Sequence, residues 1–213
     1  MHAALETCIA KYPELSECVP DIERAFETMR DSYSAGGKVL LAGNGGSASD
    51  CEHIVGELMK GFMSRRPVHD SMRRKLRQFG DAEGDYLADR LQGALPAISL
   101  VSHTALATAY ANDVAADMVF AQQVFGYGKP GDVLIGLSTS GNSANVVRAL
   151  QVARAQDLRT IGLTGRGGGA MKELCDVTIR VPYDVTPDIQ ERHLPIYHAL
   201  CIMLEDAFFG NGK

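Results

Sequence analysis

The stretch Asp132-Val133-Leu134-Ile135-Gly136-Leu137-Ser138-Thr139-Ser140-Gly141-Asn142-Ser143-Ala144 decides how this chain folds. Its first half is a nearly continuous apolar run, which is typical of a strand buried on both faces of a parallel sheet. Its second half is a turn rich in hydroxyl groups. The amphipathic run that follows, 144–155, predicts a helix. A strand, a turn and a helix in this order form the repeating unit of α/β folds.

The turn at the centre of this stretch is a candidate phosphate site. A helix that begins directly after a strand presents free backbone N–H groups and the positive end of its dipole. Ser138, Thr139, Ser140 and Ser143 add hydroxyl donors, and Gly141 lets the backbone approach a ligand closely. An ordinary Ser or Asn helix cap is the alternative. The number of polar donors in so short a turn favours a phosphate-type ligand.

The same strand–helix rhythm recurs along the chain and predicts one α/β domain over residues 1–213. Predicted strands cover 38–42, 94–101, 132–137, 159–164 and 177–181. Predicted helices cover 3–12, 21–34, 48–62, 104–111, 117–125, 144–155 and 188–209. The expected architecture is a five-stranded parallel sheet between helices, a flavodoxin-like three-layer sandwich, with N-terminal helices within residues 1–36. Ligands of such sheets bind beyond the carboxyl ends of the strands.

Composition narrows the classes of partner. The 213 residues are 46% hydrophobic and 22% charged, and the net charge of −5 gives no reason to expect nucleic acid or an anionic membrane as a partner. The five cysteines are scattered and lack CxxC spacing, which indicates reduced thiols in a cytoplasmic protein. Residues 1–14 do not have the pattern of a signal peptide, and no apolar run reaches membrane-spanning length, so we expect neither kind of segment.

Residues 65–93 interrupt the rhythm with a highly charged segment. Its composition predicts an inserted hairpin of polar helices. The basic cluster 73–77 could form a nucleic-acid patch, but acidic residues follow closely and offset its field. A solvated surface excursion is therefore the favoured interpretation.

A second polar turn, Gly43-Asn44-Gly45-Gly46-Ser47, follows the first predicted strand. It lacks the Gly-Lys-Ser/Thr ending of a Walker A loop and the third glycine of GxGxxG, so nucleotide binding of either type is disfavoured. Together with the turn 138–143, it predicts one pocket for a small phosphorylated molecule.

Candidate acid–base residues lie on two predicted helices. His53 and Glu57 are spaced i,i+4 and share a face that begins at the second turn, although a surface salt bridge is the alternative. His198 lies in an apolar run, where a lone histidine is commonly a core residue. Glu191, seven residues earlier, shares nearly the same helical face, and Gln190 is rotated by about 80°. Spacing alone does not choose between Gln190 and Glu191.

These motifs together resemble sugar isomerase (SIS) domains. The carrying residues are 43–48, 137–144, the Asn112-Asp113 pair, and 188–191 with His198. The closest likeness is to the phosphoheptose isomerases, which convert sedoheptulose 7-phosphate to D-glycero-D-manno-heptose 7-phosphate. The resemblance implies a homotetramer whose active sites are completed across subunits.

The resemblance also implies residue roles. Glu57 and His198 match the catalytic pair of the family, and some members bind zinc through a set that here is His53, Glu57, Gln190 and His198. This selects Gln190 over Glu191. The implied substrate- and phosphate-binding residues are Asn44, Gly45, Ser47, Asp113, Ser138, Thr139, Ser140, Ser143 and Gln190.

Aldose–ketose isomerisation fits these residue types. It moves a proton between C1 and C2 through an enediol(ate), with Glu57 as base and His198 as acid/base. Zinc would act as a Lewis acid on the two oxygens. The alternative is a non-catalytic SIS protein, either a phosphosugar sensor or a protein that binds the bacterial replication initiator. The presence of Glu57, Gln190 and His198 favours an enzyme.

Overall fold

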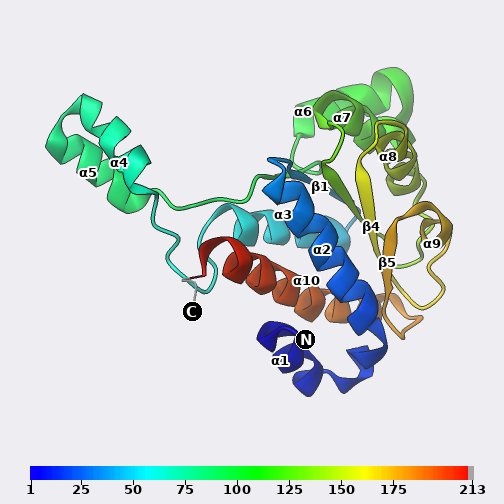
Figure 1. Ribbon diagram of the computed structural model, residues 1–213. Coiled ribbons are helices and arrows are strands. Elements are labelled where there is room, and N and C mark those ends of the chain that lie inside the picture. The colour runs from blue at the N-terminus through cyan, green and yellow to red at the C-terminus, as the bar shows by residue number, and fades with distance from the viewer. Residues whose placement is uncertain (211–213) are drawn as a thin grey trace.

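The computed structural model describes residues 1–210 and contains a five-stranded, wholly parallel sheet between two layers of helices (Figure 1). The strands are β1 (Val39–Gly43), β2 (Ala97–Ser99), β3 (Val133–Leu137), β4 (Arg159–Thr164) and β5 (Val177–Arg180). Their order across the sheet is β2-β1-β3-β4-β5. The predicted α/β fold is confirmed.

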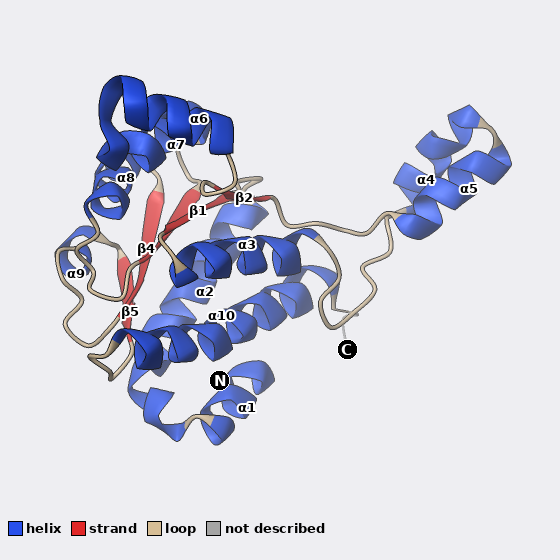
Figure 2. Cartoon of the chain, turned by 180° about the vertical axis from the view of Figure 1, so that it is seen from behind, coloured by secondary structure: helices blue, strands red, loops and turns tan. Residues whose placement is uncertain are grey.

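The helices form two layers because alternate strand residues face opposite sides (Figure 2). Leu41 and Ile135 point to the side covered by the N-terminal helices and by the helices over 46–59 and 186–209. Leu40 and Leu134 point to the side covered by the helices over 119–127 and 144–155. The α-helices are α1 (Ala3–Lys11), α2 (Val19–Ser34), α3 (Gly46–Met59), α4 (Asp70–Leu76), α5 (Asp81–Arg90), α6 (Thr104–Tyr110), α7 (Val119–Tyr127), α8 (Ala144–Ala155), α9 (Met171–Leu174) and α10 (Thr186–Phe209).

Strands β1 and β3 are neighbours in register, with Val39 beside Val133 and Gly43 beside Leu137. Both strands therefore end at the same edge of the sheet. The two polar turns singled out in the sequence leave that edge side by side, as the strand–helix pattern predicted.

Strand β2 differs from the pattern in extent, whereas helix α10 agrees with it. Strand β2 covers three residues, whereas the sequence predicted 94–101. Pro96 has no N–H to donate to a ladder, and only its carbonyl is used, by the Val39 N–H. Helix α10 continues through Pro195 to Phe209, even though a proline removes one helical hydrogen bond.

Helices α4 and α5 form a hairpin that projects from the body, as Figures 1 and 2 show. Pro67 and Gln92 form an antiparallel bridge at its base. Arg73 bonds to Asp85 and Asp89 across the hairpin. The charged segment is thus a helical excursion, as predicted.

The five cysteines are unpaired. Within residues 1–210, no helix has the length and apolar character needed to cross a membrane.

Candidate functional site

The two polar turns are tied together by a reciprocal pair of amides. Asn44 Nδ2 donates to Asn145 Oδ1, and Asn145 Nδ2 donates to Asn44 Oδ1, both at 2.9 Å. Asn44 was predicted as a site residue, whereas Asn145 was missed because it lies inside the first turn of α8. This pair fixes the separation of the two turns.

The hydroxyl groups of the turn after β3 hydrogen-bond within the turn, and no side chain caps helix α8. The hydroxyl of Ser143 does not cap α8 but lies 2.9 Å from Ser138 Oγ, and Ser140 Oγ accepts from the Asn142 N–H. Gly141 has φ +68°, and a Cβ there would lie 2.0 Å from the carbonyl oxygen of Gly168. Only glycine fits that position. The Ser143 side chain therefore does not act as a helix cap, which was the alternative interpretation of this turn.

The turn after β1 also leads into a helix that has no side-chain cap. Helix α3 begins at Gly46 without a side-chain cap, and Gly45 has φ +56°. Ser47 is buried at the first turn of the helix. The amide of Gln190 lies over this point, since a Cβ on Gly46 would lie 2.7 Å from Gln190 Nε2.

His53, Glu57 and His198 meet between α3 and α10. His53 Nε2 lies 3.2 Å from Glu57 Oε1, and Lys60 Nζ lies 3.1 Å from Glu57 Oε2. The rings of His53 and His198 are 5.0 Å apart, nearly perpendicular. The structure therefore brings the predicted catalytic pair and His53 together in one chain.

The surroundings of the His198 imidazole favour its neutral form. Its Nε2 is buried and has no hydrogen-bond partner among the described residues. Burial lowers the pKa of His198, the neighbouring His53 acts in the same direction, and Glu57 opposes them. His198 also lines a cavity of about 210 Å³ between α1 and α10.

Tyr197 and Asp50 belong to this cluster and were missed. The Tyr197 hydroxyl donates to Asp50 Oδ1 at 3.1 Å and lies 3.0 Å from His53 Nδ1. Burial, followed by the charge of Asp50, raises the pKa of Tyr197, and burial raises the pKa of Asp50. Asp50 could have been noticed from its i,i+3 spacing to His53, but no local signal links Tyr197 to α3.

Gln190 lies apart from this cluster, beside the turn after β1. Gln190 contacts Gly46, and the seven residues from Gly46 to His53 correspond to about 10 Å along α3. Asp113 lies exposed in a π-helical turn (Ala111–Ala115) after α6 and accepts a hydrogen bond from Asn112.

The four predicted zinc ligands do not all lie close together. No group of three or more His, Cys, Asp or Glu side chains in residues 1–210 is arranged to hold a metal ion. The donor types nevertheless fit zinc, because two imidazoles and a carboxylate are a common zinc set. His198 Nε2 is buried and has no hydrogen-bond partner within residues 1–210. His53, Glu57 and His198 are therefore chemically suited to the ion, and Gln190 is two helical turns away.

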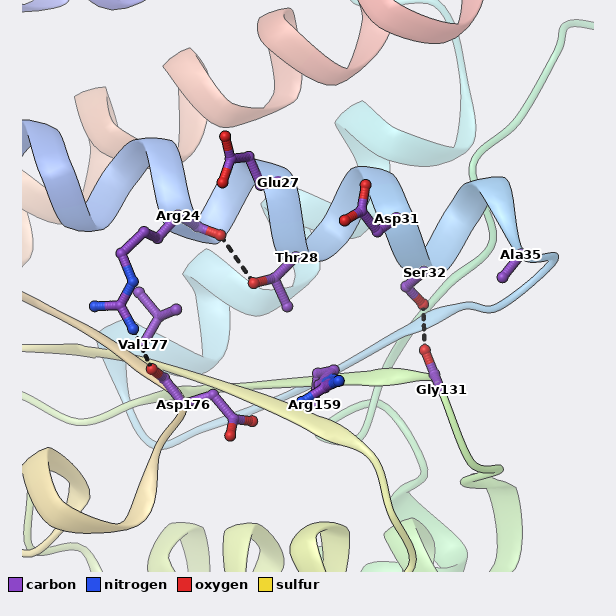
Figure 3. Close-up of a pocket in the computed structure, with 10 residues that line it drawn as sticks. All are labelled: Arg24, Glu27, Thr28, Asp31, Ser32, Ala35, Gly131, Arg159, Asp176 and Val177. Carbon is purple, nitrogen blue, oxygen red and sulfur yellow. Dashed lines mark hydrogen bonds between the residues drawn. The ribbon is translucent and has the colours of Figure 1, made fainter.

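A hollow of about 440 Å³ at the opposite edge of the sheet lies away from these residues (Figure 3). Arg24 donates to the Asp176 carbonyl, and Ser32 donates to the Gly131 carbonyl. Its wall is thus held together by its own hydrogen bonds, and none of the predicted site residues lines it.

Known proteins resemble this chain over nearly its whole length. The SIS domain family model matches residues 14–93 and 87–165. The phosphoheptose isomerase of Rhodospirillum rubrum is 42% identical over 207 residues, which are 97% of this chain and 96% of that protein. The solved phosphoheptose isomerases of Neisseria gonorrhoeae and Francisella tularensis are 34% and 31% identical, with TM-scores of 0.73 and 0.76. These alignments cover 96% and 95% of this chain, and 96% and 94% of the solved chains.

Proposed function

The chain belongs to the SIS domain family and, within it, to the phosphoheptose isomerases, and we propose that it interconverts sedoheptulose 7-phosphate and D-glycero-D-manno-heptose 7-phosphate. The observation that carries this function is the meeting of Glu57 with His53 and His198 on two helices that start from the edge of the sheet holding the phosphate turn. A sensor would need the turn but not the acid–base cluster.

One set of residues anchors the substrate, and another set transfers its protons. The turn 138–143 binds the phosphate through its hydroxyls and the free N–H groups that begin α8. Anchoring one end of an open-chain sugar orients its C1 and C2 toward the acid–base groups.

Proton transfer then proceeds in two balanced halves. Glu57 removes a proton from C1 of the ketose while the carbonyl oxygen on C2 gains one, which gives an enediol. Glu57 returns a proton to C2 while the C1 oxygen loses one, which gives the aldose. His198, with its lowered pKa, is neutral at physiological pH and can carry the proton between the two oxygens.

We also propose that the acid–base cluster binds a zinc ion. His53, Glu57 and His198 would hold it, whereas Gln190 of the same chain lies two helical turns away, at Gly46. When bound, the ion would act as a Lewis acid that stabilises negative charge on the substrate oxygens. The buried Nε2 of His198, which has no hydrogen-bond partner in the described part of the chain, supports this assignment.

We further propose a homotetramer with sites completed across subunits. The ten residues from Ser47 to Glu57 correspond to about 15 Å of helix, and Gln190 lies at the far end from Glu57. Completion by a neighbouring chain would bring anchoring and acid–base groups closer together. A cytoplasmic location is proposed on the five unpaired cysteines.

The test is turnover by purified, chelator-treated protein with sedoheptulose 7-phosphate and other ketose phosphates, with and without added zinc. The sedoheptulose ester should be isomerised and Glu57→Gln should lower kcat by at least about 10²-fold with binding retained, because the amide cannot accept the carbon-bound proton. The matched control is Glu52→Gln, on the same helix, whose carboxylate is exposed and accepts from Ser102.

Two outcomes would contradict the proposal. Near-normal turnover by Glu57→Gln would remove Glu57 as the base. Tight binding of a sugar phosphate without turnover of any substrate would favour the phosphosugar-sensing alternative.

A further inference from the structure

A glycine-rich turn, Gly165-Arg166-Gly167-Gly168-Gly169, follows strand β4 and lies beside the turn 138–143. Strands β3 and β4 are parallel neighbours, with Leu137 beside Leu163, so the two turns leave the sheet at the same edge. None of the predicted site residues belongs to this glycine turn (165–169). Its contacts show instead how the turn 138–143 is held in place.

Two backbone hydrogen bonds join the two turns. The Gly165 N–H donates to the Thr139 carbonyl at 2.9 Å. Beyond the other end of the glycine turn, the Met171 N–H donates to the Gly141 carbonyl at 3.1 Å. The turn 138–143 is therefore fastened to the neighbouring backbone at two separate points.

The two turns approach each other so closely that a side chain does not fit between them. Gly168 and Gly169 have φ values of +73° and +52°, a conformation that favours glycine. A Cβ on Gly169 would lie 2.5 Å from the Ser140 carbonyl oxygen and 2.7 Å from Asn142 Oδ1. The glycine turn thus packs its bare backbone against Ser140 and Asn142.

The side chain of Asn142 completes the contact between the turns. Its Oδ1 accepts from the Ala170 N–H at 2.9 Å, and its Nδ2 donates to the Ser140 carbonyl at 3.1 Å. These bonds use the amide oxygen and one of the two amide protons. The backbone N–H of Asn142 donates to Ser140 Oγ at 3.1 Å, so the Ser140 hydroxyl accepts there and keeps its own proton for another partner.

We propose that Asn142 is a positioning residue, which holds the turn 138–143 on the glycine turn in the shape that receives the phosphate and does not itself contact the substrate. The inference rests on the phosphate-binding role of that turn in the proposed function. Asn142 acts through Ser140, because it bonds both the carbonyl and the hydroxyl of that residue. Donors that are fixed before the ligand arrives lose less conformational freedom on binding.

The first test removes the amide. Asn142→Ala should weaken the binding of inorganic phosphate about tenfold, because the bridge to Ala170 and Ser140 is lost, as measured by isothermal titration calorimetry. The KM for the sugar phosphate should rise by a similar factor, with kcat changed less than about twofold. Gln151→Ala, which removes an exposed amide from α8, is the matched control and should leave both constants unchanged.

The second test disturbs the same contact from the other turn. Gly169→Ala places a Cβ against Ser140 and Asn142, so it should weaken phosphate binding although residue 169 lies outside the turn 138–143. Gly167→Ala is its control, because a Cβ there would meet open space. Asn142→Ala combined with Gly169→Ala should weaken binding by less than the product of the two single effects, because both substitutions disrupt one contact.

Four results would overturn the inference. They are unchanged phosphate binding by Asn142→Ala, a fall in its kcat without a rise in KM, independent effects in the double variant, and a wild-type chain that binds no phosphate. A wild-type chain that binds phosphate but isomerises no sugar phosphate, together with weaker binding by Asn142→Ala, would support the inference and refute the proposed reaction instead.

Discussion

His193 is fully buried on α10, and its environment makes its charge costly. Its Nδ1 has no partner within the described residues, and its Nε2 lies 3.4 Å from the Thr164 carbonyl. Burial lowers the pKa of His193 to about 4, from 6.5 in an exposed chain, and the bond to Thr164 opposes this only partly. Unlike His198, it lies outside the acid–base cluster, so its protonation affects stability alone.

The pH dependence of stability follows from that shift. The folded state holds the neutral ring, so the contribution of His193 is fully present above its unfolded pKa and is lost as pH falls toward the folded value. Between about pH 7 and pH 5 this loss amounts to about 2 kcal/mol. Chemical denaturation of the wild type and His193→Gln should show a flatter pH dependence in the variant. The exposed His69→Gln should keep the wild-type slope, and equal slopes in all three would contradict the prediction.

A substitution at Gly141 tests whether the shape of the turn 138–143 holds the substrate. Gly141→Ala requires a left-handed backbone and a Cβ 2.0 Å from Gly168 O, so the turn must deform. Strain of about 1–3 kcal/mol at such a position should raise KM about tenfold or more. Gly167→Ala is the control, because its Cβ would meet open space. Equal KM values in the two variants would mean that the turn geometry does not hold the substrate.

At the scale of elements, the end of α3 is fastened to α10 by a buried ion pair. Arg66 and Glu205 are both nearly inaccessible, with Arg66 Nε 2.7 Å from Glu205 Oε1. Glu205 also accepts from the N–H groups of residues 62–64, and Arg66 donates to the Glu57 and Leu58 carbonyls. This network holds in place the helix end that carries Glu57.

Removing one charge of that pair leaves the other buried without compensation. Glu205→Gln should therefore lower the free energy of unfolding by about 3–5 kcal/mol, measured by chemical denaturation. It should also lower kcat, because the Glu57 backbone loses its anchor. The control is Asp206→Asn, at an exposed neighbour whose carboxylate is paired with His2, which should cost less than about 0.5 kcal/mol. A Glu205 variant as stable as the control would contradict this account.

The sequence predicted the features that depend on residues close together in the chain and missed those that depend on distant residues. His53 and Glu57 could be placed on one face because i,i+4 spacing is local. The strand–turn–helix pattern likewise placed both polar turns at one edge of the sheet. The Tyr197 contact with His53 spans 144 residues, and it depends on how α3 packs on α10. No periodicity encodes that packing, nor the amide pair of Asn44 and Asn145.

At the scale of the whole molecule, the distribution of functional groups within one chain bears on assembly. The phosphate turn and Glu57 lie at opposite ends of the path along α3, and Gln190 stays with the turn. His53, Glu57 and His198 stay together at the other end. If a site combines the turn of one subunit with the cluster of another, two differently damaged chains can repair each other.

The proposed sharing of sites therefore predicts complementation between inactive variants. Ser140→Asp places a carboxylate where the phosphate binds and can still accept from the Asn142 N–H, so the turn should fold while like-charge repulsion weakens substrate binding. Coexpression with Glu57→Gln under two different affinity tags, followed by double-tag purification, should yield mixed oligomers with far more activity than either parent. Oligomers of Glu57→Gln carrying both tags are the control and should stay inactive. If the mixed oligomers are no more active than their parents, each active site is built within a single chain.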